Sequence, residues 1–162
     1  MAREIPTLGI CLGAQLLATA TGGEVQLAQR GPEIGLCDVD VLEAAAGDSL
    51  FGELRGTRAP AVQWHWLEAA TLPPVATLLT TSAACPHQAF RLGRFAWAVQ
   101  FHPEVLTPTV LDWFAGDAES VEQLGYTRTE LVAAVRGAED QLRQVWGGFA
   151  ERFAAVVTQQ HG

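Results

Sequence analysis

Residues 7–15 read TLGICLGAQ, and this stretch decides how the rest of the chain is interpreted. A short apolar run that leads into Gly-x-Cys-x-Gly is typical of a strand that turns sharply into a helix, with the cysteine on the turn. Cys11 is therefore a candidate nucleophile, because the N-terminus of a following helix favours the thiolate. The backbone N–H of Leu12 would then face a developing oxyanion. A buried cysteine between two packing glycines is the alternative interpretation.

A thiolate nucleophile needs a base, and His102 is the strongest candidate. It lies in the sequence QFHPE at residues 100–104, directly after an apolar strand, and Glu104 could hold its imidazole through the second ring nitrogen. A histidine before proline is otherwise typical of a loop or a hydrogen-bonded core position. His65 and His87 are expected to make only local hydrogen bonds.

Residues 1–106 alternate short apolar runs with glycine and proline, which predicts an α/β domain. After the strand and helix at the cysteine, the pattern predicts further strands and one hairpin. The hairpin's second arm is apolar on both faces, as expected of a central strand. The predicted strands cover residues 33–42, 61–65 and 75–82, and the hairpin arms cover residues 88–92 and 94–101.

From residue 107 the apolar period becomes helical, which predicts a helical C-terminal extension over residues 107–162. Residues 107–108 read Thr-Pro and suggest a helix start with the threonine as cap. Residues 127–130 form a capping-box sequence. One apolar stripe follows over residues 131–156, and the glycine pair at 147–148 could bend or split that helix.

The composition excludes several classes of function. The chain of 162 residues has ten basic residues, all arginine, and contains neither lysine nor asparagine. Lysine-dependent Schiff-base chemistry, pyridoxal phosphate enzymes and ordinary P-loops are therefore excluded, as is a Cys-His-Asn triad. A formal net charge of −8 argues against nucleic-acid binding.

Localisation and metal binding are constrained more weakly. No apolar run approaches the roughly 20 residues of a membrane span, and the first residues lack a signal-peptide core, so we expect a cytoplasmic protein without a membrane partner. The three cysteines are Cys11, Cys37 and Cys85. They form no C-x-x-C pair, so neither a disulfide framework nor a metal site is expected, and Cys37 and Cys85 are interpreted as packing or loop thiols.

Together, GICLGAQ at residues 9–15 and QFHPE at residues 100–104 resemble the signatures of class I (triad) glutamine amidotransferases, in particular the stand-alone GMP synthase-like type. The resemblance implies a three-layer, flavodoxin-like open α/β sheet for residues 1–106, with residues 107–162 as the helical extension. It also implies that Cys11 attacks the side-chain amide of glutamine, that His102 transfers the proton, and that Glu104 holds His102.

The same resemblance assigns the substrate contacts. Gln15 matches a family residue that binds the amino-acid end of glutamine, and it lies one helical turn beyond Cys11. Trp66 and Leu67 match a loop whose backbone touches the same end. Packing of the tryptophans in the core is the alternative for this segment. No cofactor is implied, and the ammonia would pass to an acceptor or to a synthetase such as a GMP synthase-type partner.

The order of the elements departs from the family. There, the strand before the cysteine follows several other elements, one of which has a glycine-rich turn that donates a second oxyanion N–H. Nothing of this kind precedes Cys11, so the sequence is interpreted as an amidotransferase that lacks its N-terminal part. Loss of one such donor lowers the rate roughly 10²- to 10³-fold. A misassigned start, a decaying gene fragment and a partner chain that completes the sheet are the three explanations.

The leading hypothesis is therefore a glutaminase that forms a γ-glutamyl thioester and releases glutamate and ammonia. The alternative is a catalytically impaired fragment or a non-catalytic regulatory or interaction subunit with the same fold. A different cysteine hydrolase would fit the turn at Cys11, but it would leave Gln15 and residues 100–104 unexplained.

Overall fold

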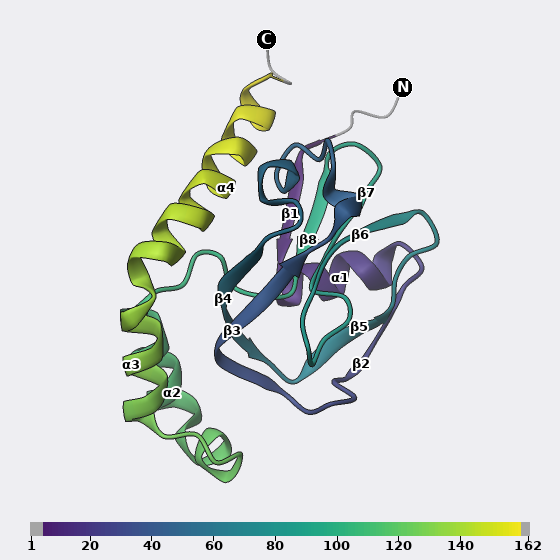
Figure 1. The fold of residues 1–162 in the computed structure, drawn as a ribbon. Helices are drawn as coiled ribbons and strands as arrows, with labels where there is room; N and C mark the ends of the chain where they lie inside the picture. Colours follow the sequence, from purple (N-terminus) through teal and green to yellow (C-terminus); the bar gives the residue numbers. More distant parts are fainter. Residues whose placement is uncertain (1–4, 160–162) are drawn as a thin grey trace.

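The computed structural model describes residues 5–159, so the first four residues and His161 lie outside it (Figure 1). A mixed sheet has the strand order β1-β8-β7-β6-β3-β4. Within it, β1 and β8 are parallel and the other neighbours are antiparallel. The strands are β1 (Thr7–Ile10), β3 (Glu33–Val41), β4 (Arg58–His65), β6 (Ala76–Thr81), β7 (Ala89–Leu92) and β8 (Ala96–Val99).

Helices cover both faces of this sheet. The helix α1 (Leu12–Ala20) packs on one face, where Ala14 and Ala18 join Phe90 and Ala98 in a small apolar cluster. The other face carries α2 (Thr107–Gln123), α3 (Arg128–Gly137) and α4 (Glu139–Gln159), which Figure 1 shows along one side of the molecule. The three-layer architecture expected from the sequence is confirmed.

Strand β8 shows why both of its faces are apolar. Trp97 and Val99 point into the large core beneath the helical extension, whereas Ala98 points toward α1. All three side chains are buried, and β8 lies between β1 and β7. It is therefore an interior strand, as its sequence predicts.

A small second sheet, formed by β2 (Glu24–Leu27) and β5 (Leu67–Thr71), was not predicted. Both strands are short, and most residues of β2 are exposed, so the sequence lacks a clear alternating pattern. Their antiparallel pairing joins segments about 40 residues apart. This sheet packs against α1 and places the segment around Leu67 close to the turn at Cys11.

The helical extension differs from its prediction in two details. The N-cap of α2 is Leu106 rather than Thr107, whose backbone N–H instead donates to the Glu139 carboxylate at 3.1 Å. The break between helices falls at Ala138 rather than at residues 147–148, through which α4 continues. The predicted capping box is present, since the Thr127 hydroxyl accepts the N–H three residues further on. Two 3-10 turns, Glu43–Ala45 and Gly52–Leu54, complete the described elements.

Candidate active site

Cys11 lies on the turn that the sequence predicts between β1 and α1. Its backbone has φ 47° and ψ −104°, which makes it the one non-glycine residue with positive φ among residues 5–159. Such a conformation costs about 1–3 kcal/mol and is concentrated at functional sites. The Cys11 N–H donates to the carbonyl of Val99 at 2.8 Å, so the turn is fixed to the end of β8.

Close approach of β1 and α1 requires one of the two flanking glycines. A Cβ on Gly9 would lie 2.6 Å from the carbonyl oxygen of Gly13 and 2.9 Å from the nitrogen of Ala14, which backbone atoms could not accommodate. A Cβ on Gly13 would meet no atom within 4 Å. The sequence expectation that small neighbours relieve crowding therefore holds for Gly9 and is wrong for Gly13.

His102 and Glu104 lie just beyond β8. The His102 N–H donates to the carbonyl of Val62 at 2.8 Å, which fixes its backbone, and Nδ1 lies 2.8 Å from the Glu104 carboxylate. The imidazole also packs edge-on against Trp113 of α2, with ring centroids 4.6 Å apart. Glu104 is half-exposed, whereas the His102 ring is mostly buried.

The imidazole of His102 is hydrogen-bonded to the Cys11 thiol as well as to Glu104. Because Glu104 engages Nδ1, the bond to the sulfur is left to Nε2. Burial lowers the pKa of His102, but the interactions with Cys11 and Glu104 raise it further, to about 9. The three residues predicted as catalytic are thus brought together, although Cys11 is far from the other two in the sequence.

The residues predicted to bind substrate lie beside this group. Gln15 is buried, and its Nε2 donates to the carbonyl of Leu67 at 3.1 Å. The Trp66 side chain packs against the large core, and its carbonyl accepts the N–H of Ala28 at 2.9 Å. Leu12 begins α1, where first-turn N–H groups lack intrahelical partners, and its side chain is exposed.

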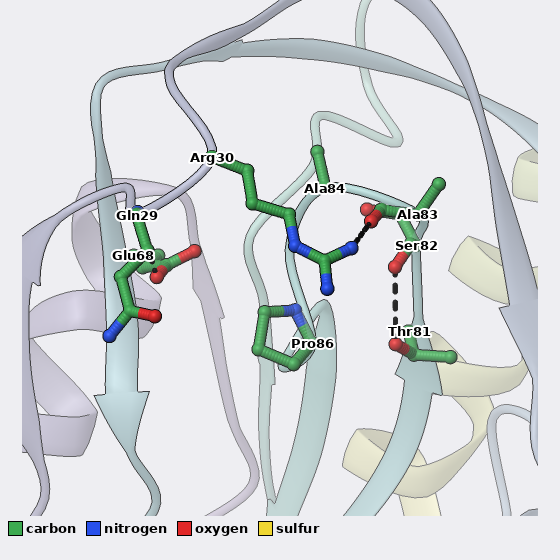
Figure 2. Close-up of a pocket in the computed structure, with 8 residues that line it drawn as sticks. All are labelled: Gln29, Arg30, Glu68, Thr81, Ser82, Ala83, Ala84 and Pro86. Carbon is green, nitrogen blue, oxygen red and sulfur yellow. Dashed lines mark hydrogen bonds between the residues drawn. The ribbon is translucent and has the colours of Figure 1, made fainter.

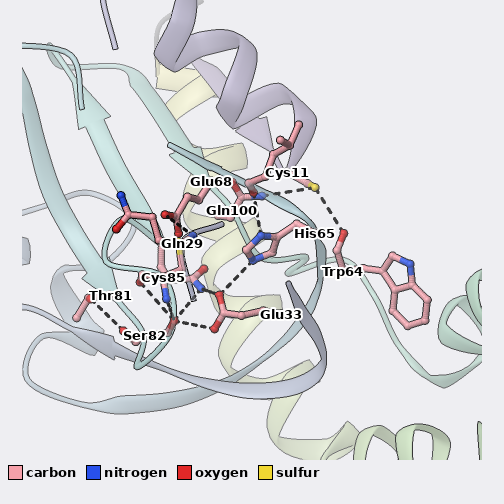
Figure 3. A network of polar contacts seen from close by, with 12 residues as sticks. Cys11, Gln29, Glu33, Trp64, His65, Glu68, Thr81, Ser82, Cys85 and Gln100 are labelled. Carbon is pink, nitrogen blue, oxygen red and sulfur yellow. Dashed lines mark hydrogen bonds and ion pairs between the residues drawn. The ribbon is translucent and has the colours of Figure 1, made fainter. Parts of the chain in front are cut away.

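A buried histidine–carboxylate pair that the sequence did not reveal lies behind these residues (Figure 3). His65 Nδ1 donates to the carbonyl of Leu67 at 2.9 Å, and Nε2 lies 3.2 Å from the Glu33 carboxylate. Gln88 and Ser82 also donate to Glu33, at 2.6 and 2.7 Å. The local hydrogen bond predicted for His65 is present, but its pairing with Glu33 crosses from β4 to β3.

Gln100 is the other residue that sequence reasoning left without a role. Its Nε2 lies 3.6 Å from the Cys11 sulfur, and its Oε1 accepts from Gln15 at 3.2 Å. The side chain is 2% exposed. The signal was available, because Gln100 stands two residues before His102 at the end of a buried strand.

The family described as Glutamine amidotransferase class-I matches residues 1–112 of this chain. The match covers well over half of the sequence and includes both ends of the site. The chain belongs to the class-I glutamine amidotransferase family.

Individual relatives agree with this membership. A subunit of the glutamine-hydrolyzing GMP synthase of Pyrococcus furiosus is 38% identical over 105 residues, which are 63% of this chain and 52% of the relative. Gamma-glutamyl peptidase 3 of Arabidopsis thaliana is 33% identical over 101 residues, 60% of this chain and 40% of the relative. The chain thus spans about half the length of the curated relatives it matches.

Solved structures of amidotransferases share the architecture. A glutamine amidotransferase from Thermotoga maritima superposes with a TM-score of 0.80 at 30% identity, over 93% of this chain and 63% of that one. The flavodoxin-like fold of the class-I amidotransferases, with a C-terminal helical segment, is therefore present here.

The remaining cysteines of this amidotransferase chain differ from Cys11. Burial raises the pKa of the Cys37 thiol to about 11 and that of Cys85 to about 12, so both stay protonated near neutral pH. This supports their interpretation as packing thiols. Among residues 5–159, no group of three or more histidine, cysteine, aspartate or glutamate side chains is arranged to hold a metal ion.

A polar pocket of about 260 Å³ lies on the surface away from Cys11 (Figure 2). Arg30 closes one side by donating to the carbonyl of Ala83, and the buried Glu68 accepts the N–H of Gln29 at 3.2 Å. None of the predicted catalytic residues lines it. Within the described part of this family member, no helix has the length and apolar character needed to cross a bilayer.

Proposed function

We propose that this chain hydrolyses the side-chain amide of glutamine to glutamate and ammonia. The observation that carries the proposal is the position of Cys11, on a strained strand-to-helix turn, in hydrogen-bonding contact with an imidazole that Glu104 holds from behind. A pKa of about 9 at His102 keeps the ring protonated near neutral pH, as in a thiolate–imidazolium pair. Family membership supports the same reaction class.

In the first half of the reaction, the Cys11 thiolate attacks the side-chain carbonyl carbon of glutamine. The carbonyl oxygen becomes an oxyanion, which the backbone N–H of Leu12 would stabilise at the N-terminus of α1. His102 gives its proton to the amide nitrogen, the C–N bond breaks, and ammonia leaves. The product on the enzyme is a γ-glutamyl thioester at Cys11.

In the second half, water attacks the thioester. His102, now neutral, takes a proton from the water, and the C–S bond breaks to release glutamate. The proton on His102 and the negative charge on the sulfur restore the starting ion pair. Glu104 stabilises the imidazolium form at both stages because it accepts the hydrogen bond from Nδ1.

We further propose that Gln15 and the backbone of Trp66 and Leu67 bind the amino-acid end of glutamine. Gln15 and the carbonyl of Leu67 are already in contact, next to the turn at Cys11. Amide and carbonyl groups suit the ammonium and carboxylate of an α-amino acid, because they supply both donors and acceptors.

The ammonia would pass to a separate synthetase chain. Support comes from the relatives named as one subunit of a glutamine-hydrolyzing GMP synthase, since such a name describes one part of a larger enzyme. Hydrolysis of an amide by a thiolate requires no cofactor, so any nucleotide-dependent step would take place on that partner.

The direct test is release of glutamate from glutamine by the purified chain, with Cys11→Ala as the control. We expect the variant to be inactive while its circular dichroism spectrum and melting temperature stay close to those of the parent. Full activity in Cys11→Ala would refute the assigned nucleophile. A folded parent chain without glutaminase activity, alone or with a synthetase, would favour the non-catalytic alternative.

A second substrate class follows from the relatives named gamma-glutamyl peptidases. A γ-glutamyl peptide carries the same γ-carbonyl but a larger leaving amine, so the same thioester could form from it. Comparing kcat/KM for glutamine and for γ-glutamyl dipeptides separates the two. We expect glutamine to be preferred, and a preference for the dipeptides would reassign the substrate without changing the nucleophile.

A further inference from the structure

Gln100 connects the candidate nucleophile to the candidate substrate pocket. It follows β8 directly, and its backbone N–H donates to the carbonyl of Gln88 at 2.7 Å, which fixes the start of the side chain. The amide group then lies between the Cys11 sulfur at 3.6 Å and the Gln15 side chain at 3.2 Å (Figure 3). At 2% exposure, it makes these contacts out of solvent.

The direction of the Gln100 amide follows from the hydrogen bonds around it. The carbonyl of Leu67 can only accept, so Gln15 must present its NH₂ group to it. The same NH₂ group faces Gln100, which must therefore present its oxygen. The Gln100 NH₂ group is left to point at the sulfur, and a reversed amide would place two donors against each other.

We propose that Gln100 is a catalytic residue whose Nε2–H donates to the Cys11 sulfur and stabilises it as a thiolate. This proposal rests on the proposed function for its purpose, though not for its measurement. A hydrogen bond to the charged form of a buried group favours that form. The sulfur carries negative charge as the attacking nucleophile and again as the group that leaves from the thioester, so one donor serves both halves of the reaction.

Other groups around the sulfur sharpen the expectation. His102, backed by Glu104, is the titratable group that faces it and favours the thiolate. The carbonyl of Trp64, 4.0 Å away, can only accept and so favours the protonated thiol. Without the Gln100 donor, His102 alone would oppose this carbonyl, and the balance would move toward the thiol.

Gln100 also links the two functions of the site. Its oxygen accepts from Gln15, which in turn reaches the carbonyl of Leu67. A substrate that pulls on Gln15 would therefore be felt at the amide that contacts the sulfur. Removal of Gln100 is expected to affect kcat through the thiolate and KM through Gln15.

The experiment measures the rate at which Cys11 is alkylated by iodoacetamide as a function of pH, by mass spectrometry of its peptide. Gln100→Met is compared with Gln63→Met. Gln63 is also fully buried, on β4, and neither of its amide atoms has a hydrogen-bond partner among the described residues. Methionine keeps the length of glutamine and removes the donor, so the pair isolates the contact with the sulfur.

We expect the midpoint of the alkylation profile to move up by about one pH unit in Gln100→Met and to stay unchanged in Gln63→Met. A folded Gln100→Met variant with the parental profile would overturn the proposal. Should Gln100→Met fail to fold, Gln100→Glu keeps the size and the acceptor for Gln15 but replaces the donor. It is expected to raise the midpoint at least as far, and a parental midpoint there would also overturn the proposal.

Alkylation does not require turnover of glutamine. If the chain proves inactive toward glutamine while Gln100→Met still shifts the profile, the proposed function fails and the role of Gln100 stands. If glutamine is hydrolysed and the profile does not shift, the reverse holds.

Discussion

The chain contains two histidine–carboxylate pairs, and their surroundings separate their roles. In one, His102 Nδ1 lies 2.8 Å from Glu104, and the ring's remaining nitrogen faces the Cys11 sulfur. In the other, His65 Nε2 lies 3.2 Å from Glu33, and the ring's remaining nitrogen donates to the carbonyl of Leu67. The first is placed to move a proton, whereas the second holds a segment of backbone.

A carboxylate beside a histidine therefore does not by itself identify a general base. What the other ring nitrogen meets decides the chemistry. A sulfur can exchange a proton with the ring, and a backbone carbonyl can only accept a hydrogen bond. Four predictions test this difference, from the largest expected effect to the smallest.

Replacement of His102 should have the largest effect. His102→Gln removes the proton donor and acceptor, so we expect kcat for glutamine hydrolysis to fall by about 10³-fold or more, with KM changed little. His65→Gln should leave kcat within about tenfold of the parent. Steady-state kinetics of both variants checks the contrast, and equal losses of kcat would erase the distinction between the two pairs.

Replacement of Glu104 should move a pH profile. Glu104 raises the pKa of His102, so Glu104→Gln should lower that pKa from about 9. The protonated ring is then lost at lower pH, and the alkaline limb of the kcat/KM profile moves down. The rate near neutral pH should fall by about 10- to 10²-fold. An alkaline limb that stays in place would mean that Glu104 does not control His102.

Replacement of His65 should act on substrate binding. The Leu67 carbonyl that His65 holds also receives Gln15, so His65→Gln should raise KM by about tenfold. His87 offers a matched control, because it donates to the Ala69 carbonyl on the same strand at 2.7 Å without touching Leu67. His87→Gln should leave KM near the parental value, and a similar rise in both variants would indicate general loosening of β5.

Removal of the aromatic ring behind His102 should have the smallest effect. Trp113 packs on His102 and on Trp64, so Trp113→Leu should lower kcat/KM a few-fold and Trp113→Phe should restore most of it. Phe153→Leu is the control, since Phe153 packs on Trp97 elsewhere in the same extension. Loss of activity in the Phe153 variant alone would locate the effect in overall stability.

The two pairs also show what the sequence could and could not reveal. Glu104 stands two residues after His102, so their proximity can be read from the chain. Glu33 and His65 are 32 residues apart and meet because the register of β3 and β4 places them directly opposite each other. Register is set by the whole sheet, so no local pattern announces this pair.

Other differences have the same physical origin. The strand, turn and helix around Cys11 were predictable because they are local, and Gly9 permits the close approach that the turn needs. The pairing of β2 with β5, which brings Leu67 to Gln15, is non-local and was missed. The cap of α2 was misplaced because Glu139 from another helix takes the N–H of Thr107.

The central claim is that Cys11 is the nucleophile that glutamine meets. The most direct measurement is to incubate the folded chain with a glutamine analogue that carries an electrophilic diazoketone in place of the amide, and then to map the adduct by peptide mass spectrometry. The account predicts one adduct, on Cys11, which excess glutamine suppresses and which His102→Gln slows strongly. An adduct on Cys37 or Cys85, or none at all, would contradict it.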